Sequence, residues 1–179
     1  MKRFIAVLVL GLIALGIQGG LSMVIPRELC PDLGLLVVIA LGLHWQEATS
    51  GLIVASVLGF TADLLSSSIF GGHALMRLLV FSATAISRQK IDLRGGAALG
   101  LFAGVMTIFY ALGLLLLMRF FGADSEWLSR SEIGGLFLHV LVNAVCAPAI
   151  AALMIRVCEW ADGEASRPGL EIETRRTSL

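Results

Sequence analysis

Charged side chains are scarce in this sequence. Of its 179 residues, only 15% are Asp, Glu, Lys or Arg, whereas 58% are hydrophobic. A soluble domain has about 25% charged residues, so this chain has too little polar surface to remain in solution. The composition therefore predicts an integral membrane protein. The net charge is zero, which removes any argument for a nucleic-acid partner.

The sequence also lacks catalytic and metal-binding motifs. It contains no GxSxG, no HExxH and no nucleotide-binding loop, and the acids other than Asp63 lie in loops and the C-terminal tail. The three cysteines, Cys30, Cys146 and Cys158, form no CxxC pair and no Cys/His ligand spacing, so we expect small apolar fillers. These absences favour a scaffold or binding protein without a cofactor over an enzyme.

Apolar runs predict an all-α bundle of six membrane spans with short connections. The runs cover residues 4–25, 33–45, 51–65, 74–86, 95–121 and 133–157. The second run is shorter than the usual span of about 20 residues, which bilayer thinning or burial among neighbouring helices can accommodate. The first run could instead be a secretory signal, but it is longer than a signal core of about 7–15 residues. We expect a transmembrane domain over 1–158 and a mobile cytoplasmic tail over 159–179.

Basic residues set the expected orientation, because they prefer cytoplasmic loops. Lys2 and Arg3 place the N-terminus in the cytoplasm. Six spans put the basic loop 87–94 and the tail on that same side, and the acidic loop containing Asp124, Glu126 and Glu132 outside. Five spans would place the most basic loop outside. The sequence therefore favours six spans with both termini cytoplasmic.

Polar side chains interrupt the third and fourth apolar runs at Asp63, Ser66, His73 and Arg77. A single Asp or Arg near mid-span costs roughly 2.5–3.5 kcal/mol, so such residues usually face the bundle interior and pair. Asp63 and Arg77 are equally distant from Phe70 at the predicted outer turn, so we expect them to pair. Ser66 and His73 would donate to the carboxylate. Alternatively, Arg77 reaches the outer headgroups while Asp63 bonds to hydroxyl or backbone groups, or these residues form an ion or proton pathway.

Two strips of small residues recur at four-residue spacing on the third and fifth spans. The first comprises Gly51, Ala55 and Gly59 and leads to Asp63, and the second comprises Gly96, Gly100 and Gly104. Such strips let helix backbones approach closely in lipid. The first strip leads to a carboxylate and should turn inward. We expect a partner helix to dock near the second strip, with packing inside the bundle as the alternative.

The sixth span carries His139 and Asn143 on one face and Pro148 close behind them. Both polar side chains can hydrogen-bond across the bundle, and a lone intramembrane histidine is more often a structural hydrogen-bonding group than a ligand. Pro148 removes a backbone donor and should bend or loosen this helix.

Three segments together resemble the rod shape-determining protein MreD family. The first is Pro31 and Asp32 before a short leucine-rich span, and the third is Asn143 with Pro148 in the last helix. The second, which is the most specific, is Asp-Leu-x-Ser at residues 63–66, followed after the turn by Gly71 and by His-Ala-Leu at 73–75. The resemblance covers residues 1–157. Ser67 and Arg77 depart from the family pattern, so the expected ion pair is an interpretation of this sequence alone.

The resemblance implies a non-enzymatic inner-membrane scaffold of the bacterial cell-elongation (rod) complex, which supports peptidoglycan synthesis and cell shape. Members of that family bind MreC, a single-span protein. They work beside the actin-like MreB, RodA and a class B penicillin-binding transpeptidase. The resemblance also implies a fold similar to the six-helix S components of energy-coupling-factor vitamin transporters.

That similarity supplies an alternative function, a small-molecule-binding membrane subunit. Such a subunit needs a polar, often aromatic pocket that opens outward. The expected outer loops offer few candidates for it, namely residues 26–32, the serine turn and Trp127. A channel or proton-coupled transporter is a third possibility, and it depends only on Asp63, His73 and His139.

Overall fold

In the computed structural model, which describes residues 2–66, 70–90, 95–121 and 130–165, the chain is a bundle of α-helices. The helices are α1 (Lys2–Leu21), α2 (Leu33–His44), α3 (Ala48–Leu65), α4 (Gly72–Ser87), α5 (Gly96–Phe120) and α6 (Arg130–Ala165). A short 3-10 helix, η1 (Arg27–Leu29), lies between α1 and α2. The predicted all-α fold is confirmed, and no strand is found in the described ranges.

Four of these helices, α1, α3, α5 and α6, are long and apolar enough to cross a membrane. The chain therefore has the helices that a multi-pass membrane protein requires. By contrast, α2 and α4 have 12 and 16 residues. At about 1.5 Å per residue they reach only about 18 and 24 Å, against a hydrocarbon core of about 30 Å. Two helices are thus short, where the sequence predicted one short span.

Burial inside the bundle explains why α2 can be short. Every residue from Gly34 to Gly42 is buried, and α2 packs against all five other helices. A helix that is hydrophobic on every side is stable when protein surrounds it. Because α2 contacts neighbouring helices rather than lipid, its length need not match the bilayer.

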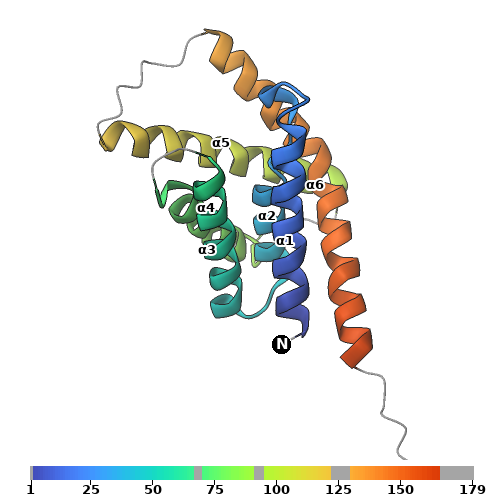
Figure 1. The fold of residues 1–179 in the computed structure, drawn as a ribbon. Helices are drawn as coiled ribbons and strands as arrows, with labels where there is room; N and C mark the ends of the chain where they lie inside the picture. Colours follow the sequence, from blue (N-terminus) through green and yellow to red (C-terminus); the bar gives the residue numbers. More distant parts are fainter. Residues whose placement is uncertain (1, 67–69, 91–94, 122–129, 166–179) are drawn as a thin grey trace, which may run out of the picture.

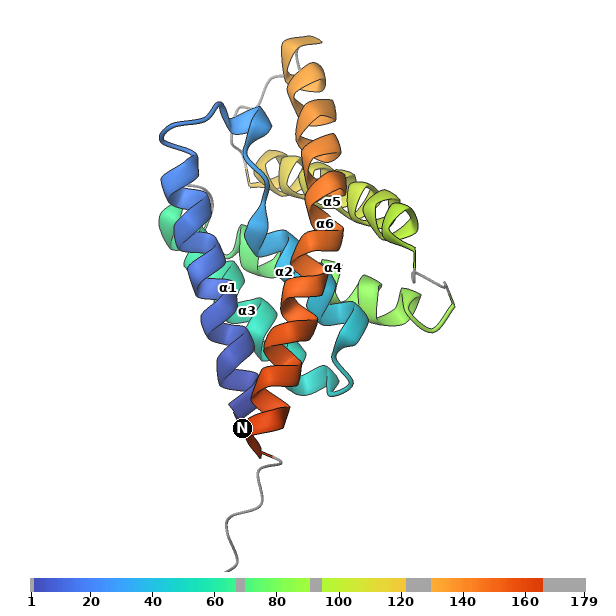
Figure 2. The ribbon, with the colours of Figure 1, turned by 90° about the vertical axis from the view of Figure 1, so that its right-hand side faces the viewer.

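The helices around α2 differ in the direction of their axes. In both ribbon views α1 and α6 run side by side in opposite directions, and the N-terminus lies beside the C-terminal end of α6 (Figures 1 and 2). Helix α5 runs across the direction of α1 in Figure 1, and α6 bends along its length. Pro148 lies inside α6 and cannot donate a hydrogen bond to the carbonyl of Ala144.

Helices α3 and α4 form a close hairpin because glycine lines their contact. A Cβ atom on Gly59 would lie 2.3 Å from Cα of Ala74, and one on Gly51 would lie 2.3 Å from the Phe81 ring. The strip on α3 therefore turns inward, as expected. Before α4, Gly71 has a φ of +89°, a left-handed conformation that glycine adopts without strain.

The glycine strip on α5 packs inside the bundle against α6. A Cβ atom on Gly100 would lie 2.6 Å from the carbonyl oxygen of Ala144, which is the carbonyl that Pro148 leaves without its helical donor. Cβ atoms on Gly104 and Gly96 would lie 3.4 Å from Val140 and 3.9 Å from Pro148. Since α6 covers this face, the expectation that a partner helix docks on the strip is corrected in favour of internal packing.

One end of the bundle brings together two basic residues, Arg3 of α1 and Arg88 at the end of α4. The Arg3 guanidinium lies 3.9 Å from the Asp162 carboxylate and 4.8 Å from the centre of the Trp45 ring. Arg88, at the end of α4, donates to the carbonyl of Trp45 at the end of α2. We call this the basic end. Arg3 and Arg88, which belong to two of the basic segments assigned to one membrane side, therefore both lie against Trp45.

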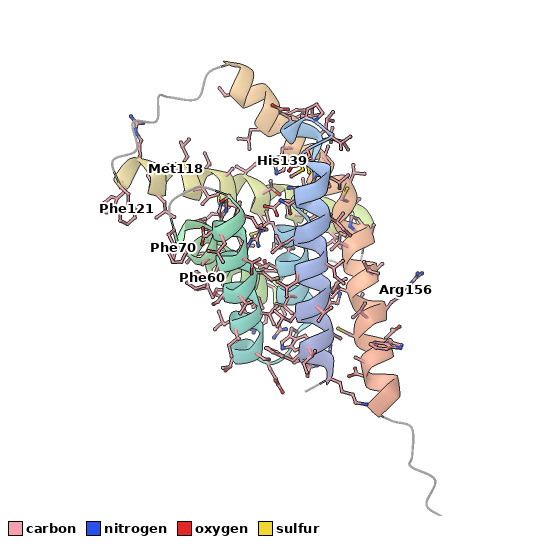
Figure 3. All side chains as sticks on the ribbon, in the orientation of Figure 1. Phe60, Phe70, Met118, Phe121, His139 and Arg156 are labelled. Carbon is pink, nitrogen blue, oxygen red and sulfur yellow. The ribbon has the colours of Figure 1, made fainter. Side chains whose placement is uncertain are left out.

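The last helix extends past residue 158, where the tail was expected to begin. Helix α6 continues to Ala165 instead of ending near residue 158, so residues 159–165 extend the last helix. The remainder of the expected tail, 166–179, lies outside the described residues, as do Asp124 and Glu126 of the acidic loop. Arg156 on α6 is exposed and points away from the bundle (Figure 3).

Candidate functional site

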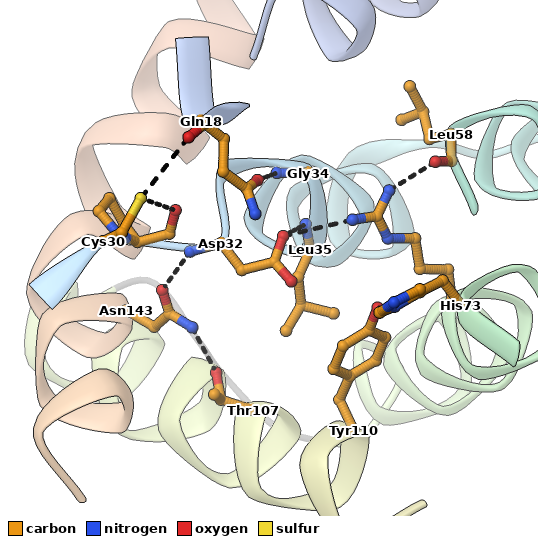
Figure 4. Close-up of polar contacts among 12 residues, drawn as sticks. Gln18, Cys30, Asp32, Gly34, Leu35, Leu58, His73, Thr107, Tyr110 and Asn143 are labelled. Atoms are coloured by element: carbon orange, nitrogen blue, oxygen red, sulfur yellow. Dashed lines mark hydrogen bonds and ion pairs between the residues drawn. The ribbon is translucent and has the colours of Figure 1, made fainter. Parts of the chain in front are cut away.

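Asp32 is the centre of a buried polar network (Figure 4). Its side chain caps α2, because Oδ1 accepts the Leu35 N–H at 2.9 Å. A carboxylate there satisfies one of the backbone donors that the first helical turn leaves unpaired. The same oxygen lies 3.3 Å from Nη2 of Arg77, and the Asp32 N–H donates to Oδ1 of Asn143 at 2.9 Å. Asp32 therefore links α2 to both α4 and α6.

Arg77 is the largest fully buried side chain described, with 1% of its surface exposed. Besides its ion pair with Asp32, Nη1 donates to the carbonyl of Leu58 on α3 at 2.6 Å. Its Nε atom is buried without a hydrogen-bond partner. A buried charge is tolerated when it is paired and hydrogen-bonded, so Asp32 makes this position possible.

The expected ion pair between Asp63 and Arg77 is replaced by a different arrangement. The Asp63 oxygens accept the backbone N–H groups of His73 at 2.8 Å and Ala74 at 3.2 Å. Asp63 therefore caps the first turn of α4, where a negative charge also complements the helix dipole. Helix α4 begins only at Gly72, so its residue beside Asp63 is His73. Arg77 lies one helical turn further along α4, and its side chain reaches Asp32 at the start of α2.

Further hydrogen bonds connect the network to α5 and α1. Nδ1 of His73 lies 2.5 Å from the hydroxyl of Tyr110. The ring therefore bonds to α5, whereas the sequence predicted a bond to Asp63. Asn143 donates to Thr107 at 3.2 Å, and its Nδ2 lies 3.3 Å from Nε2 of His139. From α1, Gln18 accepts the N–H of Gly34 at 3.2 Å.

Each of the six helices thus contributes at least one group to the network. In a membrane interior, helix association depends on close packing and on interhelical hydrogen bonds rather than on the hydrophobic effect. A network that joins every helix fixes the arrangement of the whole bundle. Its chemistry is that of hydrogen bonding and charge pairing.

An open cavity of about 630 Å³ lies beside the network. Its lining joins Asp32 and Arg77 to polar groups of α1, α4 and α6, and includes apolar side chains as well. The residues are Leu15, Gln18, Gly19, Ser22, Cys30, Asp32, Ala62, Leu65, Ser66, His73, Arg77, Met118 and His139. Gly19, Ser22 and Leu65 are exposed, so the cavity reaches the surface. These residues lie toward the end of α1 that is opposite the basic end.

The structure brings most of the sequence-predicted residues to this region. Asp32 and Asn143 bond directly, and Ser66, His73 and His139 line the cavity. Pro31 accepts the Leu33 N–H at 3.0 Å at the start of α2. Gly71 and Pro148 instead affect the backbone conformation. Gly71 adopts a positive φ before α4, and Pro148 lies inside α6. The strip of Gly96, Gly100 and Gly104 lies apart, between α5 and α6.

Three polar groups of the network were not selected from the sequence: Gln18, Thr107 and Tyr110. Two of them carried a signal, because Gln18 interrupts the first apolar run and Tyr110 is the only tyrosine of the chain. In the described part of the chain, no cluster of three or more His, Cys, Asp or Glu side chains could hold a metal ion. The three cysteines are free thiols.

Comparison of the chain with protein-family models, with curated proteins and with solved structures finds no match.

Proposed function

We propose that this protein is a non-enzymatic inner-membrane scaffold of the bacterial elongation complex, similar to the MreD family, which binds an MreC-like single-span protein and supports peptidoglycan synthesis. The observation that carries the proposal is the 2.9 Å hydrogen bond between Asp32 and Asn143. These residues belong to two separate segments of the family resemblance, 111 positions apart in sequence. The second segment contributes Asp63, which caps the start of α4. Residues distant in sequence thus act as one structural unit.

We also propose that the bundle has six spans, resembles the S components of vitamin transporters, and keeps both termini in the cytoplasm. The basic end supports this orientation, because lysine and arginine are enriched on the cytoplasmic side. The cavity then opens toward the opposite side of the membrane.

Cysteine labelling of intact cells tests this orientation. In a variant whose three native cysteines are replaced by alanine, Ser22→Cys reports the cavity end and Glu47→Cys reports the basic end, and both positions are exposed. We expect a membrane-impermeant maleimide to label position 22 in intact cells, and position 47 only after the cells are opened. The reverse pattern would contradict the proposed orientation.

The partner helix must dock on a face that the chain leaves open. Since α6 covers the glycine strip, we place the docking surface on another side of α5, which the bundle leaves open. This open face carries exposed apolar side chains along the helix: Leu101, Val105, Ile108, Leu112 and Leu116. The surface is apolar, as contact with a transmembrane helix requires.

Photo-crosslinking from the native membrane tests both the partner and its place. A photoreactive residue at Leu112 should give an adduct with an MreC-like protein, identified by mass spectrometry. Val9 on α1 is the matched control, because it is 46% exposed and Leu112 is 50% exposed. Adducts from Val9 alone would move the interface to α1, and no MreC-like adduct from either site would count against the scaffold function.

A second candidate function is a small-molecule-binding membrane subunit. The observation that favours it is the cavity of about 630 Å³, whose lining combines polar and apolar groups. Ligand pockets typically have volumes of about 300–1,000 Å³ and a few placed polar groups.

A further inference from the structure

We infer that the cavity beside Asp32 is a binding site for an uncharged molecule that carries both hydroxyl or amide groups and an apolar part. This inference rests on the second candidate function and is independent of the scaffold function. It follows from the charge balance around the cavity, from the hydrogen-bonding groups that face it, and from its apolar lining.

The charges around the cavity already compensate one another. Asp32 is paired with Arg77 at 3.3 Å. Both oxygens of Asp63 accept N–H groups at the start of α4, which carries about half a positive charge. A charged ligand would therefore add a buried charge with no opposite charge left to pair with it, which is strongly unfavourable. The cavity thus disfavours anions and cations alike.

Hydrogen-bonding capacity nevertheless remains in the lining. The bonds of Asp32 described above use Oδ1, so Oδ2 is an acceptor for a ligand. Gln18 accepts the Gly34 N–H through Oε1, which leaves its NH₂ group as a donor. A ligand that both donates and accepts would satisfy these groups, and a hydrocarbon chain would not.

The apolar side chains of the lining favour a ligand that also has an apolar part. Leu15, Ala62, Leu65 and Met118 come from α1, α3 and α5 and face the same space. Burial of apolar ligand surface supplies most of the affinity in such pockets, and the few polar groups fix orientation. A polyol with no apolar surface would leave these side chains without contacts.

Cys30 is a suitable reporter of occupancy, because this residue lines the cavity and its thiol is free. The variant Cys146→Ala/Cys158→Ala leaves it as the one thiol. The neutral reagent methyl methanethiosulfonate converts a thiolate to a methyl disulfide and releases methanesulfinate. Burial and the nearby Asp32 raise the pKa of the Cys30 thiol, so the reaction is followed at mildly alkaline pH.

The probe is the water-soluble small-molecule extract of the source cells, separated by ion exchange into neutral, anionic and cationic fractions. We expect the neutral fraction alone to slow methylthiolation of Cys30, by about tenfold when its active component reaches about ten times its Kd. Native mass spectrometry then gives the mass of the bound molecule. Protection by a charged fraction would overturn the assigned ligand class, and protection by no fraction would overturn the site.

Two glycines of α1 provide a matched pair of variants. Cβ atoms on Gly19 and Gly20 would each have no neighbour within 4 Å, so larger side chains fit at both positions. Only Gly19 lines the cavity. Gly19→Phe should abolish the mass adduct and the protection, while Gly20→Phe should retain both. Equal behaviour of the two variants would overturn the cavity as the site. MreC-like crosslinking at Leu112 should persist in both, so loss of ligand binding is distinguishable from loss of the scaffold function.

Discussion

Arg77→Met should destabilise the folded protein by about 3–5 kcal/mol, because it leaves the buried carboxylate of Asp32 without its cation. Asp32→Asn should also be destabilising, since it removes the charge that compensates Arg77. The double variant Asp32→Asn/Arg77→Met contains neither charge, so its loss should be smaller than the sum of the two single losses. The coupling energy should be about 1–3 kcal/mol, measured by SDS titration of the purified protein in detergent.

The matched control for this cycle is Asp63→Asn combined with Arg77→Met. Asp63 is also a buried carboxylate, but it bonds to backbone N–H groups of α4. Its coupling to Arg77 should therefore be well below that of Asp32. A larger coupling for Asp63 than for Asp32 would restore the ion pair expected from the sequence and contradict the arrangement around α2.

Gly100→Leu should prevent the protein from folding, because the new side chain would meet the backbone of α6. The oxygen 2.6 Å from its Cβ belongs to the Ala144 carbonyl, which cannot rotate away as a side chain can. Gly16→Leu on α1 is the control, since a Cβ there has no neighbour within 4 Å. Size-exclusion chromatography of the detergent-solubilised proteins should give a monodisperse peak for Gly16→Leu and aggregate for Gly100→Leu. Normal folding of Gly100→Leu would show that α5 and α6 can separate at this point.

Local features of this fold could be predicted from the sequence. The apolar runs predicted the number and order of the helices, because runs of such length in a chain with so little charge are typical of membrane helices. The inward turn of Gly51 and Gly59 followed from the carboxylate on the same strip. The position of Arg3 and Arg88 at the same end agrees with the preference of positive charge for one side of a membrane.

The pairings between distant segments could not be predicted in the same way. The expected pairing of Asp63 with Arg77 assumed a symmetric hairpin about Phe70, but α4 begins at Gly72 and shifts one side of the hairpin. Arg77 instead meets Asp32, which belongs to a different helix and is 45 positions away. Nothing local in the sequence sets that distance, because it depends on how α2 packs among its neighbours. The glycine strip of α5 was compatible with two packing arrangements, and the position of α6 decides between them.

The hydrogen bond from Asp32 to Asn143 has a consequence for how the protein is made. Asp32 enters the membrane early in synthesis, whereas Asn143 is translated 111 residues later. Until α6 has been inserted, the Asp32 N–H lacks its acceptor, and α2 lacks one of the helices that bury it. An unfinished chain therefore exposes a polar segment that a complete chain conceals. The start of α2 therefore has all of these partners only in a chain that has received its last helix.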